Sequence, residues 1–293
     1  MSLPSATTAV VCDTTAYLPD EIASDLGIHR VSLYVTLEGE THPEAEMADY
    51  DTFYERLGRS KEGATTSQPS IGDFTTVYEP LLADGREIIS IHLSAGISGT
   101  FESARQARQK LIDEDKGGER IYVYDSRSAC GGAALLTIAA SHVARAGGSG
   151  ADALARVEES RDALKMWFAI DTLEYLRKGG RIGAAQAFVG STLKIKPILT
   201  LEEEITPIER VRTRRRALER MVDFARERAA DGADAWVVQH IHDPETAQTL
   251  VEHGRDIYGC EPVFVSEIGP VIGAHIGPGL LGVGGLPASL LRA

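Results

Sequence analysis

Residues 88–107 contain a strand, a turn and a helix start, and this segment constrains the fold more than any other part of the chain. The apolar run from Ile88 to Leu93 predicts a short buried strand, and residues 94–99 form a turn rich in glycine and hydroxyl side chains. From Thr100 onward, alanines recur at helical spacing, which predicts a helix. A short buried strand that leads at once into a helix is typical of an α/β sheet.

This turn is suited either to capping the helix or to binding an anion. The first turn of a helix has N–H groups without intrahelical partners and about half a positive charge, so a carboxylate or phosphate is favoured there. The hydroxyls of Ser94, Ser98 and Thr100 can add further donors. Capping by Ser98 or Thr100 explains the same residues, so both interpretations stay open on this segment alone.

The same rhythm of short strands and helices runs along the whole chain. A strand at 9–12 ends at Asp13, which is either an N-cap or a ligand-facing residue, and the alternating segment 30–37 predicts another strand. The polar, proline-stopped segment 64–70 is expected to be a loop. Further along, strands at 196–201 and 205–212 flank Glu202 to Glu204, which predicts a hairpin with an acidic tip.

These elements predict an α/β protein of two domains. At 293 residues the chain is long for one compact core. We expect residues 1–164 to form an open, mostly parallel sheet with helices on both faces, and residues 165–293 to form a mixed α/β domain with antiparallel strands.

Composition excludes several classes of protein. No apolar run approaches the ~20 residues that cross a bilayer, and the start of the chain lacks a signal-peptide pattern, so we expect a cytoplasmic protein without stable membrane insertion. With 30 basic and 43 acidic residues the net charge is −13, which argues against nucleic acid as a partner. The three cysteines lack Cys-x-x-Cys spacing, and we assign them no chemistry.

Two local patterns suggest chemistry that we weigh against simpler explanations. Ser98 in its glycine turn, with His275 as a base, is an alternative as a serine-type acyl ester hydrolase, although the second glycine comes one residue too early for a nucleophile elbow. His240 and His242 sit at one strand end, but no third ligand is spaced to complete a metal site. We therefore expect no metal and no cofactor.

Positive charge is concentrated in one cluster of this acidic protein. A solvated helix face neutralised by neighbouring glutamates is one explanation, and a phosphate site or a docking face for a partner is the other. The cluster consists of Arg210, Arg212, Arg214, Arg215, Arg216 and Arg220.

Five motifs, in order along the chain, together resemble the DegV family, whose members include the fatty-acid-binding B subunit of bacterial fatty acid kinase. The resemblance covers the chain from about Ala9 to Gly285. The motifs are Thr66-Ser-Gln-Pro-Ser, Leu93-Ser-Ala-Gly-Ile-Ser-Gly-Thr-Phe-Glu-Ser-Ala, Tyr124-Asp-Ser126, Thr172-Leu-Glu-Tyr-Leu-Arg-Lys-Gly-Gly-Arg-Ile and Gly273-Ala-His-Ile-Gly-Pro-Gly279.

The resemblance implies a long-chain fatty acid held in a tunnel between the two domains. By motif, it assigns the carboxylate contacts to Thr66, Ser98 and His275, with Ser94 as a neighbour. Many relatives carry a second serine where this chain has Ala95, so that contact is excluded here.

The resemblance also implies a partner. In the kinase B subunits, arginines matched here by Arg212 and Arg177 are associated with use of the bound acid by the kinase subunit.

Elementary energetics agree with a fatty acid ligand. Each buried methylene contributes ~0.8 kcal/mol, and the carboxylate must be hydrogen-bonded because burying it unpaired is costly. The chain has no phosphate loop or kinase signature. We therefore expect a non-enzymatic, lipid-binding subunit that presents its acid to a separate ATP-dependent fatty acid kinase subunit for phosphorylation to acyl phosphate.

Overall fold

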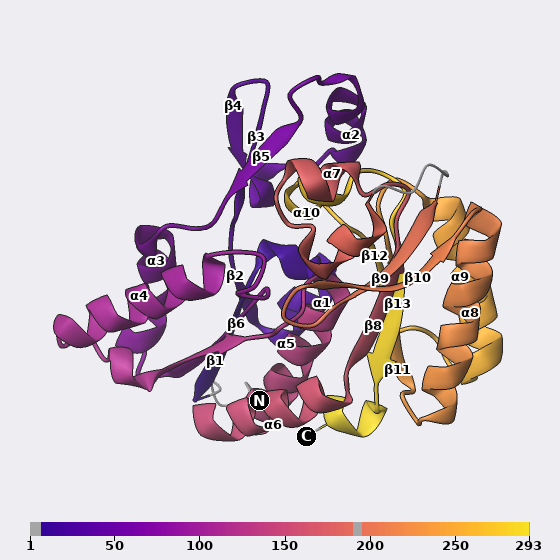
Figure 1. Ribbon diagram of the computed structural model, residues 1–293. Coiled ribbons are helices and arrows are strands. Elements are labelled where there is room, and N and C mark those ends of the chain that lie inside the picture. Colours follow the sequence, from indigo (N-terminus) through magenta and orange to yellow (C-terminus); the bar gives the residue numbers. More distant parts are fainter. Residues whose placement is uncertain (1–6, 190–194, 293) are drawn as a thin grey trace.

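The structure is a computed structural model that describes residues 7–189 and 195–292. The first residues of the chain, on which the expectation about export partly rests, lie outside the described residues. The strands form three sheets of four, six and three strands (Figure 1).

The four-stranded sheet is parallel throughout, as the sequence predicts. Its strands run in the order β2-β1-β6-β7. Successive residues of β1 face opposite sides of the sheet: Ala9 and Val11 pack against α3 and α4, while Val10 and Cys12 pack against α1 and α5. The sheet is therefore covered by helices on both faces. The strands are β1 (Thr8–Asp13), β2 (Ile28–Val31), β6 (Glu87–His92) and β7 (Ile121–Asp125), and the helices are α1 (Asp20–Leu26), α3 (Ile71–Ala83), α4 (Thr100–Asp113), α5 (Cys130–Arg145) and α6 (Gly150–Ala163).

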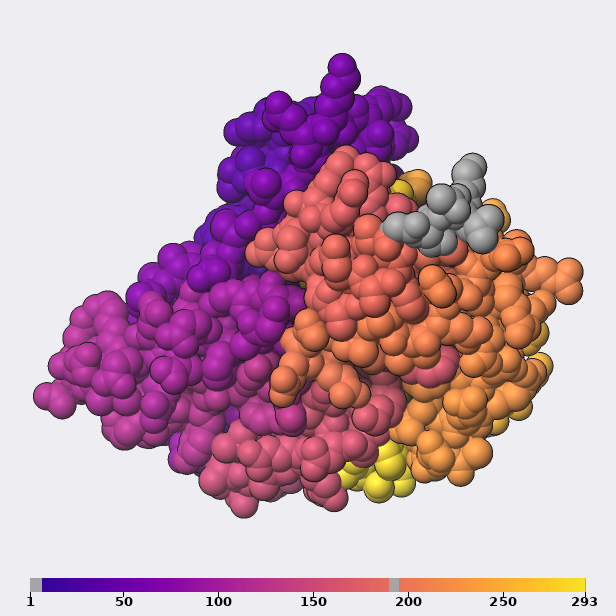
Figure 2. All heavy atoms as spheres, in the orientation of Figure 1, coloured from indigo at the N-terminus to yellow at the C-terminus, as the bar shows by residue number. Residues whose placement is uncertain are grey.

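A small lobe projects beside the parallel sheet and corrects two sequence-based predictions. It consists of α2 (Tyr50–Arg59) and a three-stranded antiparallel sheet with the order β4-β3-β5, formed by β3 (Tyr34–Leu37), β4 (Glu40–Pro43) and β5 (Ala64–Ser67). In the space-filling view the lobe rises from the body and adjoins the segment around residues 170–189 (Figure 2).

The first correction concerns the predicted strand 30–37, which is two strands in two different sheets. Leu33 lies at the break, where its N–H donates to the Thr14 hydroxyl and its carbonyl accepts from the N–H of Glu44. From Arg30 to Leu37, buried and partly exposed residues alternate without interruption, so the sequence pattern does not reveal the break.

The second correction concerns the predicted loop 64–70, whose first four residues form β5. Thr65 and Thr66 pair with Thr36 and Val35 of β3. Threonine is β-branched and suits a strand, so pairing with β3 outweighs the turn-forming tendency of the hydroxyl side chains.

The six-stranded sheet is mixed, as predicted for the second half of the chain. Its order is β10-β9-β8-β13-β11-β12, and every pair except β11 with β12 is antiparallel. The hairpin of β9 and β10 has its acidic tip at residues 202–204, which confirms that prediction. The strands are β8 (Lys165–Ala169), β9 (Lys196–Leu201), β10 (Ile205–Val211), β11 (Ala235–His240), β12 (Phe264–Glu267) and β13 (Leu281–Leu286).

Longer helices cover one side of this sheet, and short helices stand near the lobe. The helices α8 and α9 pack over β8, β11 and β13, while α7 and α10 lie beside each other at the end that faces the lobe (Figure 1). The helices are α7 (Glu174–Lys178), α8 (Arg214–Ala230), α9 (Pro244–Tyr258) and α10 (Pro270–Ile276), and the 3-10 turns are Thr14–Ala16, Glu44–Glu46, Gly118–Arg120, Gly183–Phe188 and Ala288–Leu291.

Helix α5 connects the two larger sheets. One side of it packs on β1 and β6 and another on β11 and β13, and Leu135 and Leu136 are fully buried between them. All strands of the parallel sheet precede residue 164 and all strands of the mixed sheet follow it. The boundary at 164/165 stays a prediction, because α5 shares its core with both sheets.

Among the described helices, none combines the length and the apolarity that a membrane span requires.

The shared core predicts that truncating a side chain of α5 destabilises the whole protein. Leu135→Ala leaves a cavity between two sheets and should lower the free energy of unfolding by about 2–5 kcal/mol in urea denaturation. Val265→Ala, at a position that is 41% exposed, is the matched control and should cost less than about 1 kcal/mol. Equal, small costs for both variants would contradict a core shared through α5.

Candidate functional site

An apolar cavity lies between the two halves of the chain, and we call it the inner cavity. Its volume is about 290 Å³, and apolar side chains from both halves make most of its lining. Leu33 and Leu93 come from the first half, whereas Phe168, Leu280 and Ile272 come from the second. A cavity of this kind suits an extended apolar ligand, because binding removes the apolar surface of both the ligand and the cavity from water.

Thr66 and His275 form a hydrogen bond in the wall of the inner cavity. The Thr66 hydroxyl lies 2.7 Å from Nε2 of His275, and both residues line the cavity. Thr66 belongs to β5 of the lobe and His275 to α10, so the bond joins segments that are 209 residues apart. The structure therefore brings together two of the three residues that the family resemblance assigns to the carboxylate.

The His275 ring is held neutral near pH 7. Burial, and next the positive charge of Arg181, together lower its pKa to about 4. Its Nδ1 is buried without a hydrogen-bond partner in the described part of the chain. Gly179 packs closely against this atom, since a side chain at 179 would collide with Nδ1.

Ser98 lines the same cavity from the turn before α4. Its hydroxyl lies 2.9 Å from that of Thr100 and accepts a hydrogen bond from the Thr100 N–H at 3.2 Å. The N-cap of α4 is Gly99, which has no side-chain cap bond, so the expectation that Ser98 or Thr100 is the N-cap is wrong. The Ser98 hydroxyl nevertheless accepts from the N–H of the first residue of α4, and Ser98 also lines the cavity. The turn fits closely against Gln68, because any side chain at Gly99 would overlap the Gln68 amide.

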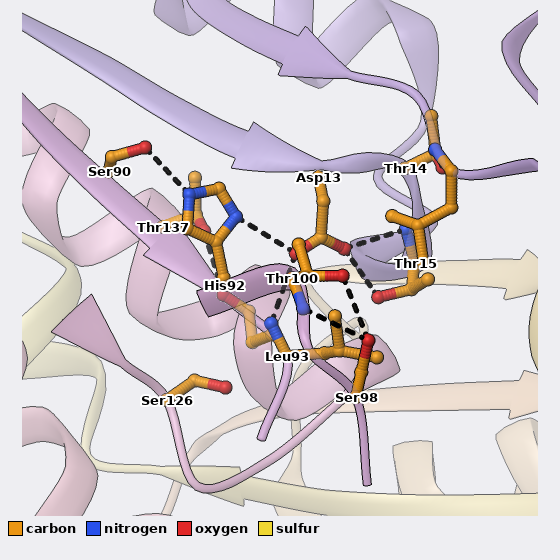
Figure 3. A network of polar contacts seen from close by, with 12 residues as sticks. Asp13, Thr14, Thr15, Ser90, His92, Leu93, Ser98, Thr100, Ser126 and Thr137 are labelled. Atoms are coloured by element: carbon orange, nitrogen blue, oxygen red, sulfur yellow. Dashed lines mark hydrogen bonds and ion pairs between the residues drawn. The ribbon is translucent and has the colours of Figure 1, made fainter. Parts of the chain in front are cut away.

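A buried polar network holds this turn on the sheet (Figure 3). The Asp13 carboxylate accepts from the Leu93 N–H at 3.0 Å and from the Thr15 N–H at 3.0 Å, and it lies 3.0 Å from Nδ1 of His92. The other ring nitrogen of His92 lies 2.7 Å from the Ser90 hydroxyl. Asp13 is 2% exposed, so it is an N-cap and a structural anchor for the turn.

Ser94 has a different position from the one that the resemblance implies. Its side chain is fully buried, donates to the carbonyl of Glu203 at 2.9 Å and accepts from the Gly96 N–H at 3.2 Å. Ser94 thus ties the turn to the acidic tip of the β9–β10 hairpin, and it lies outside the lining of the inner cavity.

Arg212 and Arg177 both lie on the surface. Arg212 follows β10 and Arg177 belongs to α7, and both are exposed. Within residues 7–189 and 195–292, neither forms an ion pair. Their roles with a kinase stay predictions.

Most of the arginine cluster around Arg212 is neutralised by carboxylates. Arg214 pairs with Asp171 and Asp243, and Arg220 pairs with Glu209. Arg215 and Arg216 both pair with Glu219. The explanation by a solvated, neutralised helix face therefore holds for these four arginines. The other two, Arg210, which lies over the Phe188 ring, and Arg212, form no ion pair among the described residues.

Glu44 links the lobe to the helix that carries His275. One carboxylate oxygen of Glu44 accepts from the Tyr17 hydroxyl at 2.8 Å and from the N–H of Val271, in the first turn of α10, at 2.8 Å. The other oxygen is buried without a partner among the described residues. Burial raises the pKa of Glu44 to about 7, although its hydrogen bonds act in the opposite direction.

His242 forms hydrogen bonds with residues that are distant from it in the sequence. Its Nδ1 lies 3.0 Å from a carboxylate oxygen of Asp51, and its N–H donates to Glu267 at 3.0 Å. Candidate metal-binding atoms of these three residues lie within 4.8 Å of one another. The hydrogen bonds already account for this arrangement, and the absence of a metal stays a prediction.

Arg181 is the site residue that sequence reasoning missed. It lines the inner cavity beside His275, and its guanidinium donates to the carbonyls of Gly179 at 2.7 Å and Ile97 at 3.3 Å. The signal is present in the sequence, where Lys178-Gly-Gly-Arg181 places cations on a tight glycine turn. The family motif directs attention to Arg177 instead.

Comparison with known proteins gives one family for nearly the whole chain. The model of the family described as "Uncharacterised protein, DegV family" matches residues 7–288. Protein DegV of Bacillus subtilis is 37% identical over 278 residues, which cover 94% of this chain and 97% of that protein.

Solved structures are similar over the same extent. A structure described as "Fatty Acid Binding of a DegV family Protein from Thermus thermophilus" has a TM-score of 0.85 and 32% identity, covering 96% of this chain and 99% of that one. The structure of DegV from B. subtilis, described as a fatty acid binding protein, has a TM-score of 0.82 and 36% identity, covering 94% of this chain and 98% of that one.

The raised pKa of Glu44 predicts how stability depends on pH. The folded state keeps a proton on Glu44 that the unfolded chain loses above its ordinary pKa of 4.5, so this contribution to stability is lost as the pH rises from 4.5 to about 7. Glu44→Gln mimics the protonated form and removes this loss. The free energy of unfolding of the variant relative to wild type should therefore rise by up to ~3 kcal/mol between about pH 5 and about pH 8.

Urea denaturation at the two pH values measures this difference. Glu46→Gln, which changes an exposed neighbour, is the control and should keep the pH dependence of wild type. A Glu44→Gln variant with that same dependence would show that Glu44 is ionised in the folded protein.

Proposed function

The chain belongs to the DegV family, and we propose that it binds a long-chain fatty acid in the inner cavity and presents the carboxylate to a separate cytoplasmic ATP-dependent kinase subunit. The observation that carries the proposal is an apolar cavity that ends at the paired side chains of Thr66 and His275. The fatty-acid-binding structures of T. thermophilus and B. subtilis support it by analogy.

The apolar lining supports binding of the acyl chain. Each methylene that leaves water contributes ~0.8 kcal/mol, so a chain of a dozen or more methylenes has ample affinity to offset the loss of its freedom. Gly282 of β13 and Phe168 of β8 are paired neighbours that line the cavity, and Met166, two residues before Phe168 in β8, lines it as well. This arrangement favours a chain that extends from His275 down the mixed sheet.

The polar end supports binding of the carboxylate. The hydroxyls of Thr66 and Ser98 can donate to it, and a neutral His275 can donate through Nε2. A carboxylate at the apolar end of the cavity would lack such donors, and burying it without hydrogen bonds would be costly.

The alternative of a serine-type hydrolase has weaker support. Such an enzyme needs a hydrogen bond between the nucleophile and its base. In the described chain, Nε2 of His275 is bonded to Thr66 and the Ser98 hydroxyl to Thr100. This pairing favours a binding protein over an acyl ester hydrolase.

The proposal predicts a bound fatty acid and a measurable effect of the hydroxyls. Mass spectrometry of an organic extract of the purified protein should detect a long-chain fatty acid. Thr66→Val combined with Ser98→Ala removes two donors to a charged group and should weaken binding of palmitate by about two orders of magnitude.

Thr41→Val, which removes an exposed hydroxyl of the lobe, is the control and should bind like wild type. Fluorescence titration measures the affinities. A protein that neither carries nor binds fatty acid would overturn the proposal, and an unchanged double variant would overturn the assignment of the head group.

The kinase part of the proposal predicts a separation between binding and turnover. Arg212→Ala changes an exposed arginine without an ion pair among the described residues, so palmitate affinity should stay within about twofold of wild type. Acyl phosphate formation with a fatty acid kinase subunit should fall at least about tenfold. Arg226→Ala on α8 is the control, and equal turnover by both variants would remove Arg212 from the kinase interface.

A further inference from the structure

Two buried polar side chains, Gln239 and Ser128, line the inner cavity apart from the residues assigned to the carboxylate. Gln239 belongs to β11 and is 2% exposed, and Ser128 lies two residues before α5 and is 3% exposed. Most of their neighbours in the lining are apolar. Because a buried polar group is costly unless it is hydrogen-bonded, the partners of these two side chains bear on what the cavity holds.

The register of the mixed sheet places Gln239 part way along the inner cavity. Gln239 of β11 pairs with Gly282 of β13, which pairs with Phe168 of β8, so the three form a row across neighbouring strands (Figure 1). Leu280 lines the cavity on the side of this row nearer α10, and Met166 lines it on the other side. Gln239 therefore faces an internal part of an acyl chain in this cavity.

The hydrogen bonds of the Gln239 amide leave one N–H available. Its Oε1 accepts from the N–H of Gly131 in the first turn of α5, where the positive end of the helix dipole favours the carbonyl oxygen. Its Nε2 donates to the Ser266 hydroxyl at 2.9 Å. A glutamine amide has two N–H groups, and the second has no hydrogen-bond partner within residues 7–189 and 195–292.

The Ser128 hydroxyl is also without a hydrogen-bond partner in the described part of the chain. Only backbone atoms of Ser128 are bonded: its N–H donates to the Ser126 hydroxyl at 3.2 Å, and its carbonyl accepts from the N–H of Ser94 at 2.7 Å. The hydroxyl lies against the first turn of α5, because a side chain at Gly132 would overlap it. Gln239 contacts the preceding residue of the same turn, so both side chains belong to one part of the cavity.

We propose that Gln239 and Ser128 form a subsite for a hydroxyl group on an internal carbon of the acyl chain. This inference rests on the proposed function, and it names hydroxylated long-chain fatty acids as the ligand class. The ligand hydroxyl accepts from the free N–H of Gln239 and exchanges a hydrogen bond with the Ser128 hydroxyl, which can both donate and accept.

The two free polar groups alter the selectivity of an otherwise apolar cavity. In a wholly apolar cavity, a hydroxyl on the chain loses its hydrogen bonds to water and weakens binding. Here an unsubstituted chain places methylenes against the Gln239 N–H and the Ser128 hydroxyl, which then stay unpaired. A site with buried polar groups discriminates against the analogue that lacks the matching group, so the hydroxylated acid is favoured.

Calorimetric titration with stearate, 10-hydroxystearate and 12-hydroxystearate tests the subsite. The titration uses the full chain after bound lipid has been removed. The better of the two hydroxy acids should bind wild type at least as tightly as stearate. In a cavity without the subsite, the buried hydroxyl would weaken binding by roughly tenfold or more.

Ser128→Ala removes one of the two partners with little change in volume. It should weaken binding of the better hydroxy acid at least about fivefold and change stearate affinity by less than about twofold. Ser24→Ala is the matched control, because Ser24 is an exposed serine of α1 outside the cavity lining, and both affinities should stay at the wild-type values. Circular dichroism checks that each variant folds.

The outcomes separate this inference from the proposed function. Wild type that binds stearate but binds both hydroxy acids more weakly overturns the subsite and leaves fatty acid binding intact. Equal effects of Ser128→Ala on the hydroxy acid and on stearate also overturn it, because Ser128 would then contribute packing alone. Wild type that binds none of the three acids overturns the proposed function and the subsite together. If Ser128→Ala fails to fold, the comparison of the three acids on wild type still decides the question.

Discussion

The hydrogen bond between Thr66 and His275 is the contact on which the site depends. It joins a strand of the lobe to a short helix of the second half of the chain, and the two residues are 209 positions apart in the sequence. The two polar groups face an apolar cavity. In such surroundings a polar group that loses its hydrogen-bond partner costs free energy, whereas a hydrogen bond that is formed there is strong. The position of the lobe over α10 therefore sets the place where the apolar cavity ends and polar chemistry begins.

Several buried contacts hold the two sides of this bond in place. Glu44 accepts from the first turn of α10, and the Tyr54 hydroxyl donates to the carbonyl of Ile268 at 2.6 Å just before that helix. On the parallel sheet, Asp13 fixes the start of the turn that carries Ser98. These polar groups are buried at the junction of the lobe and both sheets, where each hydrogen bond is protected from water. The site is thus a consequence of how three sheets meet.

The parts of this fold that could be predicted from the sequence are those with a local signal. The strand, turn and helix from Glu87 to Asp113 follow from an apolar run and a helical repeat, and the β9–β10 hairpin follows from two apolar segments around acidic residues. The break at Leu33 was missed because alternation continues through it, and β5 was missed because its pairing with β3 is not local.

The same distinction applies to the site. Thr66, Ser98 and His275 could be identified from the family motifs. The hydrogen bond between Thr66 and His275, and the position of Arg181 beside His275 in the cavity lining, arise only from tertiary packing. Ser94 shows the reverse case, since its motif position suggests a ligand contact while its hydroxyl is bonded to the hairpin tip.

A crystal structure of the protein with bound palmitate tests the central claim most directly. The account predicts the acyl chain in the inner cavity, with a carboxylate oxygen within ~3.2 Å of both the Thr66 hydroxyl and Nε2 of His275. A chain bound in the reverse direction, with its carboxylate near Gln239, or bound outside this cavity, would contradict it.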